Sequence, residues 1–127
     1  LDAIILNTDR HYGNFGVLFD TDTLKILGMS PVFDHNRSLL PELNDHQIVD
    51  SACYLQHCKP KLGQDFIQNA KRLLTDSIRQ DLIELEDFEF QQHNNILVKQ
   101  ERLDALSRIV QERIHLILSD SFHTYIN

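Results

Sequence analysis

Hydrophobic and polar positions follow different patterns in the two parts of the chain, and the pattern changes near Pro41. Before Pro41, short apolar runs are interrupted by glycine, proline, asparagine and aspartate, which favours strands and turns. Residues 15–19 and 24–27 are mostly apolar, and residues 20–23 between them have the Asp and Thr side chains of a turn. This first part therefore predicts a β-hairpin.

After Pro41 the apolar residues recur at the spacing of amphipathic helices. We expect helices over residues 45–57, 65–74, 76–85 and 99–118, with Asp45 as the N-cap of the first and a linker at 59–63. The residues expected to face inward from the three shorter helices are Ile48, Ala52, Leu55, Phe66, Ala70, Leu73, Leu74, Ile78, Leu82 and Leu85. The longest helix is expected to bury Leu103, Leu106, Ile109, Val110, Ile114 and Ile117. Its expected solvent face carries Glu101, Arg102, Arg108, Glu112 and Arg113.

Composition and charge narrow the range of functions. With 42% hydrophobic and 24% charged residues, the chain has the balance of a globular protein. Its net charge of -7 argues against a direct partner among nucleic acids or anionic membranes. No apolar run reaches the roughly 18 residues that span a bilayer. Cys53 and Cys58 make no disulfide framework, so we expect reduced thiols and a cytoplasmic location.

Polar side chains gather in the segment NTDRHYGNFG, residues 7–16, between two apolar runs. Asp9 and Asn14 lie five positions apart, and Asp34 follows after the predicted hairpin, which brings its two ends together. A carboxylate and two further oxygen donors suit Mg²⁺, with water and phosphate oxygens as its other ligands. Taken singly, Asp9 also fits a helix N-cap and Asn7 an Asx turn.

The order of these residues has a second meaning. A kinase catalytic loop places its aspartate and its metal-binding asparagine five positions apart, and a further metal-binding aspartate follows later in the chain. Asp9, Asn14 and Asp34 stand in that order with compatible offsets. The pattern therefore predicts a phosphoryl-transfer site.

The segments NTDRHYGNFGVLFD and PVFDHNRSLL resemble the catalytic loop, hairpin and metal-binding segment of HipA-like serine/threonine protein kinases. These are bacterial proteins of the kinase-like fold, often the toxin half of a toxin–antitoxin pair. The resemblance covers residues 2–40. It implies a mainly α (α+β) fold, the helical C-terminal lobe of a kinase with one small β-hairpin near the N-terminus. Residues 1–40 would then hold the catalytic and metal-binding segments, and residues 41–127 a helical subdomain.

The resemblance also assigns roles to individual residues. It makes Asp9 the catalytic aspartate, and it makes Asn14 and Asp34 the ligands of Mg²⁺ and of the ATP phosphates. For His11 it leaves two roles open, a hydrogen bond to phosphate or fixing the shape of the loop. Arg10 would pair with Asp34 or a phosphate, or hold loop carbonyls. The implied cofactors are ATP and Mg²⁺, and the implied partners are a protein with a Ser or Thr hydroxyl and an antitoxin.

Two alternatives stay open. Phosphatidylinositol kinases share the Asp-Arg-His-x-x-Asn loop, so a lipid or small-molecule kinase is the second enzyme hypothesis; the segment FDHNRSL favours the HipA-like one, because lipid kinases typically have Asp-Phe-Gly there. The other alternative is a truncated, non-catalytic interaction module.

The chain starts at Leu1 inside an apolar run, so we expect a fragment of a longer protein. The resemblance implies an N-terminal lobe with a nucleotide-covering loop and a phosphate-binding lysine. Lys25, Lys59 and Lys61 have no evident reason to replace that lysine, so we expect the isolated chain to be inactive.

Overall fold

The protein is described by a computed structural model, which covers residues 1–119; residues 120–127, at the end of the predicted helical part, lie outside the described residues. The described part is mainly helical with one two-stranded antiparallel sheet, as predicted. Its elements are α1 (Asp2–Ile5), the 3-10 helix η1 (Tyr12–Asn14), β1 (Val17–Phe19), β2 (Ile26–Met29), α2 (Asp45–Val49), α3 (Ala52–His57), α4 (Phe66–Arg72), α5 (Asp76–Glu84) and α6 (Gln100–Leu118).

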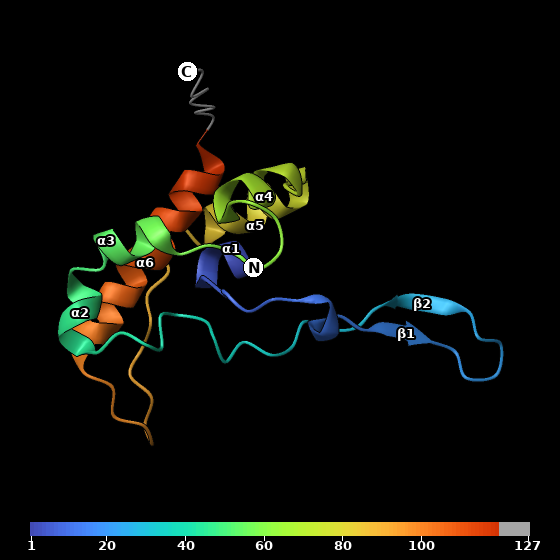
Figure 1. Ribbon diagram of the computed structural model, residues 1–127, viewed down its shortest axis with the longest axis horizontal. Coiled ribbons are helices and arrows are strands. Elements are labelled where there is room, and N and C mark those ends of the chain that lie inside the picture. The colour runs from blue at the N-terminus through green and yellow to red at the C-terminus, as the bar shows by residue number, and fades with distance from the viewer. Residues whose placement is uncertain (120–127) are drawn as a thin grey trace.

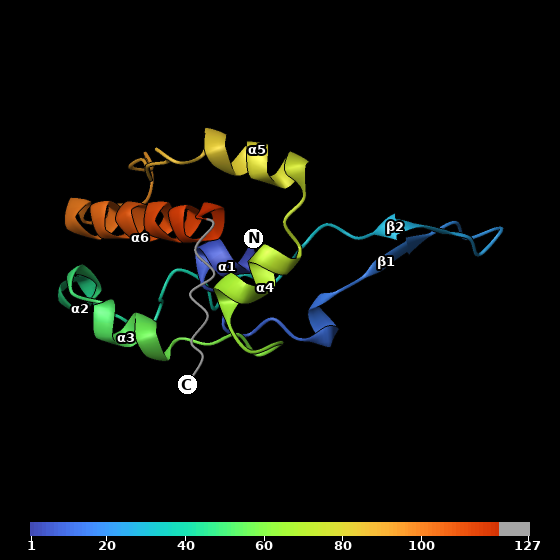
Figure 2. The same ribbon diagram turned by 90° about the horizontal axis from the view of Figure 1, so that it is seen from above.

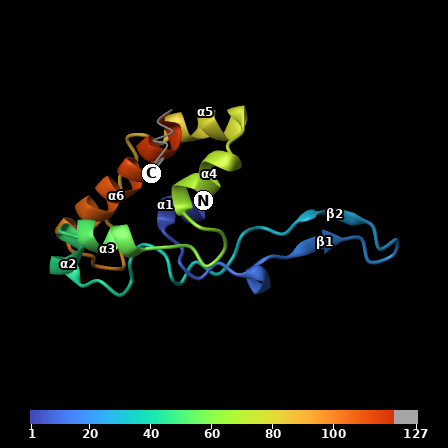
Figure 3. The same ribbon diagram turned by 45° about the horizontal axis from the view of Figure 1, so that its top comes forward.

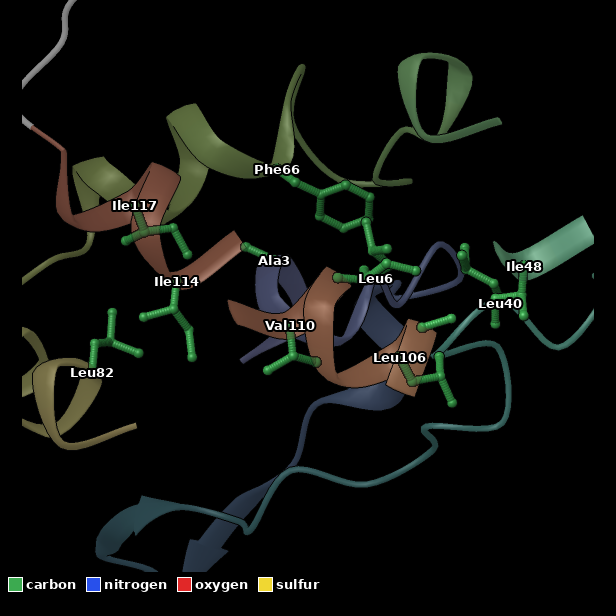
Figure 4. Close-up of a cluster of buried hydrophobic side chains, with 12 residues drawn as sticks. Ala3, Leu6, Leu40, Ile48, Phe66, Leu82, Leu106, Val110, Ile114 and Ile117 are labelled. Carbon is green, nitrogen blue, oxygen red and sulfur yellow. The ribbon is translucent and has the colours of Figure 1, made fainter. Parts of the chain in front are cut away.

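Helix α6 organises the hydrophobic core. It lies between α5 on one side and α1 and α2 on the other, and it also contacts α4 (Figure 2). Every residue of its predicted apolar stripe is buried, and Figure 4 shows several of these side chains meeting Ala3, Leu6 and Leu40. Burying one such aliphatic side chain is worth about 1.5–3 kcal/mol. The core therefore ties α1, and the loop that follows it, to the helical body.

The helix predicted over residues 45–57 is wrong in two respects. It is split into α2 and α3, with Asp50 and Ser51 between them outside helical geometry. The N-cap is Asn44 rather than Asp45: its Oδ1 accepts hydrogen bonds from the amides of His46 and Gln47. Asp and Ser side chains compete for backbone hydrogen bonds, which makes this pair a natural break. Ile48 is buried as expected, but the break leaves Ala52 exposed.

The other predicted helices hold, with corrections at individual residues. Asp65 caps α4 and Thr75 caps α5. Leu73 was expected inward but is 74% exposed, because α4 ends one residue before it. Ile78 and Leu85 are also exposed, so Leu82 is the residue that α5 buries in the core.

Arg113 was expected on the solvent face of α6, and it is instead half-buried. Its guanidinium lies over the ring of Phe66, 5.4 Å from the ring centroid, and its Nε donates a hydrogen bond to the carbonyl of Ala3. Burial lowers the pKa of Arg113 below its usual value. The aliphatic stem of an arginine can line a core while its charge is used at the edge, which the helical pattern alone does not reveal.

The predicted hairpin forms and projects away from the helical body (Figure 1). Asp20 Oδ1 closes its turn by accepting hydrogen bonds from the amides of Asp22 and Thr23. The second strand lies two residues later than expected, because Gly28 and Met29 pair with β1 instead of breaking the run. Its large apolar side chains stay exposed: Val17, Leu18, Phe19, Leu24, Ile26, Leu27 and Met29. An isolated two-stranded hairpin is marginally stable, and exposed apolar patches of this kind are typical of interaction surfaces.

Across residues 1–119, the helices are too short or too polar to cross a bilayer.

Candidate active site

The candidate site lies where two segments meet between the helical body and the hairpin (Figures 1 and 3). The first runs from the end of α1 through η1, and the second follows β2. The amide of Leu39 donates to the carbonyl of Ile5 at 2.7 Å, and the amide of Ser30 donates to that of Gly16 at 2.9 Å. These backbone bonds hold the segments together at two places, so the side chains between them face one another.

Asn14 and Asp34 are joined across 20 residues of sequence. The Nδ2 of Asn14 donates to Oδ2 of Asp34 at 2.7 Å, and the Oδ1 of Asn14 accepts from the amide of His11 at 3.2 Å. Asn14 is buried, whereas Asp34 is exposed. The structure thus brings together the two residues that the sequence assigned to a metal.

Asp34 has a positive φ of 61°, which is uncommon for a residue with a side chain and costs free energy unless its surroundings hold it. The buried Asn7 supplies part of that hold: its Nδ2 donates to the Asp34 carbonyl at 3.1 Å. Its Oδ1 accepts from the amide of Asp9 at the same distance, which is the expected Asx turn. The hydrogen bond from Asn7 to Asp34 was not predicted. The position of Asn7, a polar residue directly after an apolar run, is the feature of the sequence that could have indicated it.

Asp9 is held by a residue that the sequence interpretation placed in a linker. Lys61 lies between α3 and α4, and its Nζ is 2.8 Å from Oδ1 of Asp9. The hydrogen bond and charge of Lys61 hold the pKa of Asp9 below its usual value, so the carboxylate is ionised at neutral pH. Among the described residues, none donates a hydrogen bond to the Oδ2 of Asp9.

His11 fixes the shape of the loop, one of its two predicted roles. It is the N-cap of η1, and its Nδ1 accepts a hydrogen bond from the amide of Gly13 at 3.0 Å. A Cβ atom on Gly13 would lie 3.0 Å from the imidazole, so glycine provides the room for this contact. The alternative role, contact with a phosphate, stays a prediction.

Arg10 is the most buried charged side chain of the site, with 4% of its surface exposed. Its Nε and Nη2 bind both carboxylate oxygens of Asp2, at 2.8 and 2.9 Å, in a fork geometry. Its Nη1 donates to the carbonyl of Phe33 at 2.5 Å, and Nη2 lies 3.2 Å from Nδ1 of His35. Arg10 therefore holds the backbone beside Asp34, which is the carbonyl-holding role among its predicted alternatives.

Arg10→Met should destabilise the fold, because it removes the hydrogen-bond donor of the Asp2 carboxylate and of the Phe33 carbonyl. The expected loss in the free energy of unfolding is about 2–3 kcal/mol, measured by urea denaturation. Arg108→Met, a change on the exposed face of α6, is the matched control and should stay within about 0.5 kcal/mol of the parent. Unchanged stability combined with weaker nucleotide binding would instead favour the phosphate-binding role.

The residues present could supply only part of a metal's coordination shell, with phosphate and water as its other ligands. Within residues 1–119, no three His, Cys, Asp or Glu side chains are grouped as metal ligands. Asp34 offers a carboxylate, and Asn14 offers an amide oxygen that already accepts a hydrogen bond from the His11 amide. Mg²⁺ needs one or two protein carboxylates when phosphate and water complete its octahedron. The Oδ1 of Asp34 accepts no hydrogen bond from the described residues and remains available to such an ion.

The carboxylates of the site lie at the surface, since Asp34 is exposed and Asp9 is about half exposed. A cavity of about 580 Å³ is lined by residues of α1, α4 and α5 and of the loop before α4. Asn7 and Arg10 line it, but Asp9, Asn14 and Asp34 do not. The three residues thus lie outside this cavity, and a further surface would be needed to enclose a nucleotide over them.

Comparisons with protein-family models, with curated proteins and with solved structures found no match. The functional argument is therefore made from the site's own residues and from the sequence pattern.

Proposed function

We propose that this chain is part of a HipA-like serine/threonine protein kinase, which in its full-length form transfers the γ-phosphate of Mg·ATP to a protein hydroxyl. The observation that carries the proposal is the 2.7 Å hydrogen bond from Nδ2 of Asn14 to Oδ2 of Asp34, which brings Asp34 to the loop that also presents an ionised Asp9. Phosphoryl transfer requires this set: a carboxylate for the acceptor hydroxyl and oxygen ligands for the metal.

The residues divide the reaction between them. Asp9 accepts a hydrogen bond from the acceptor hydroxyl and orients its oxygen toward the γ-phosphorus. As the new P–O bond forms, the bond from the γ-phosphorus to the β–γ bridging oxygen breaks, ADP leaves, and the hydroxyl proton passes to Asp9. Asn14 and Asp34 would hold Mg²⁺, which supplies positive charge to the phosphate oxygens. Arg10 and Asn7 keep the two segments in register.

The proposal also accounts for two features of the surface. The resemblance implies an N-terminal lobe, and a lobe packed on the hairpin would cover its exposed apolar side chains. The same lobe would close the open site over the nucleotide. The interaction-module alternative explains the hairpin as well, but it gives no reason for a strained Asp34 held by two asparagines.

The test is transfer of labelled phosphate from [γ-³²P]ATP by the full-length protein. With Mg²⁺ present we expect label in phosphoserine or phosphothreonine, and removal of Mg²⁺ by EDTA should abolish transfer. Label in phospholipid instead of protein would establish the lipid-kinase alternative. A folded protein that neither transfers phosphate nor binds Mg·ATP by calorimetry would overturn the proposal and leave an interaction module.

A further inference from the structure

The contact between Lys61 and Asp9 joins parts of the chain that lie 52 residues apart. Both side chains are about half exposed, 54% for Lys61 and 45% for Asp9. An exposed ion pair of this kind contributes little to stability, since solvent screens it and two long side chains lose freedom. The contact therefore adds little to the stability of the fold, and its main effect is on the carboxylate of Asp9.

The loop that carries Lys61 has a defined shape. Gly63 has φ +82°, a conformation that residues with a Cβ rarely adopt. The Nδ2 of Asn69 on α4 donates to the carbonyl of Leu62 at 3.0 Å, directly after Lys61. Phe66, at the start of α4, is buried in the core beneath Arg113. These contacts fix the backbone next to Lys61 on the helical body, so the lysine is presented to Asp9 from a rigid base.

We propose that Lys61 is a positioning residue for phosphoryl transfer, an inference that rests on the proposed kinase function. It holds one oxygen of the Asp9 carboxylate, so that the other faces the acceptor hydroxyl, and it brings a positive charge beside the group in transfer. The lysine thereby supplies, from a segment that the sequence pattern assigned to a linker, a positive charge beside the catalytic loop.

The hydrogen bonds of the site support this division of work. Oδ1 of Asp9 accepts from Lys61, and Oδ2 is the oxygen to which no described residue donates. During transfer the hydroxyl proton passes to Oδ2, the acceptor oxygen bonds to the γ-phosphorus, and ADP departs with the electron pair of the broken bond. Lys61 keeps its proton throughout. Arg10 does not compete for this role, because Asp2 and the Phe33 carbonyl occupy its guanidinium.

The experiment compares Lys61→Met with the parent in the full-length protein by steady-state phosphate transfer. We expect kcat to fall about tenfold to a hundredfold, with the KM for ATP within about twofold of the parent. Lys61→Arg, which keeps the charge, should recover most of the loss, and added ethylammonium should partly restore the activity of Lys61→Ala, in which the space of the side chain is open. Lys59→Met is the matched control: this neighbouring lysine makes no ion pair with residues 1–119, and its change should leave kcat unaltered.

Three outcomes would overturn the inference, and they are distinguishable. If the parent transfers phosphate and Asp9→Asn does not, an unchanged kcat in Lys61→Met removes Lys61 from the reaction while the kinase function stands. A loss that neither Lys61→Arg nor ethylammonium reverses would show a structural role instead. A parent without phosphate transfer would overturn the kinase proposal and this inference with it.

Discussion

Asp9→Asn should lower the rate of phosphate transfer by about 10²–10⁴-fold, the range expected when a proton-accepting group is removed. An amide has nearly the shape of the carboxylate but does not accept the acceptor's proton, and it loses the charge that pairs with Lys61. The loop should keep its form, because the amide of residue 9, not its side chain, binds Asn7. The measurement is kcat for γ-phosphate transfer, with calorimetric binding of Mg·ATP recorded alongside.

The fold and the nucleotide affinity should survive this change. Asp9 is exposed enough that we expect a stability change of no more than about 0.5 kcal/mol. Asp81→Asn, an exposed carboxylate on α5, removes the same charge elsewhere and should leave kcat unchanged. Transfer that persists at the parental rate in Asp9→Asn would assign the reaction to another residue and sink the proposed mechanism.

The part of the site that the sequence predicted is the part governed by local chain geometry. A hairpin returns the chain to where it began, so the order of Asp9, Asn14 and Asp34 was enough to predict that the last two meet. The same holds for the long helix, since the period of its apolar residues determines which side is buried. A periodic pattern or a turn in the sequence is enough to predict such features.

What the sequence did not predict depends on contacts between distant segments. Lys61 meets Asp9 only because the loop before α4 is carried to the site by the packing of Phe66 and α4 against the core. Arg10 and Asp2, which share two hydrogen bonds, are closer in sequence. Leu6, the C-cap of α1 between them, has a left-handed backbone conformation that an apolar run does not predict. Both contacts therefore depend on tertiary packing and not on local sequence.

The wrong N-cap of α2 is a different kind of error, because the residues that determine it are neighbours in the sequence. Asn44 and Asp45 are both good N-caps, and the sequence interpretation chose the second. Gln47 distinguishes the two: it lies three residues after Asn44, and its Oε1 accepts a hydrogen bond from the Asn44 amide, which completes a capping box. This reciprocal hydrogen bond favours Asn44 as the N-cap of α2, and the spacing of Asn44 and Gln47 in the sequence was enough to predict it.

Asp34→Asn should lower transfer by about a thousandfold and weaken Mg²⁺-dependent nucleotide binding with it. The substitution suits the position structurally, since asparagine adopts positive φ more readily than most residues. Its side-chain oxygen can still accept from the Nδ2 of Asn14, and the backbone carbonyl still accepts from Asn7. The variant therefore removes a negative charge from the proposed metal site while it leaves the hydrogen bonds that shape the site.

Calorimetric titration of the full-length protein with ATP, with and without Mg²⁺, separates this effect from that of Asp9→Asn. Asp34→Asn should lose the part of the affinity that depends on Mg²⁺, whereas Asp9→Asn should retain it, because Asp34 and not Asp9 is proposed as a ligand of the metal. Asp22→Asn in the hairpin turn makes the same charge change on an exposed aspartate away from the site, and it should bind like the parent. Equal affinity in Asp34→Asn and the parent would mean that the Asn14–Asp34 pair does not hold the metal, and the two asparagines around Asp34 would then serve the fold alone.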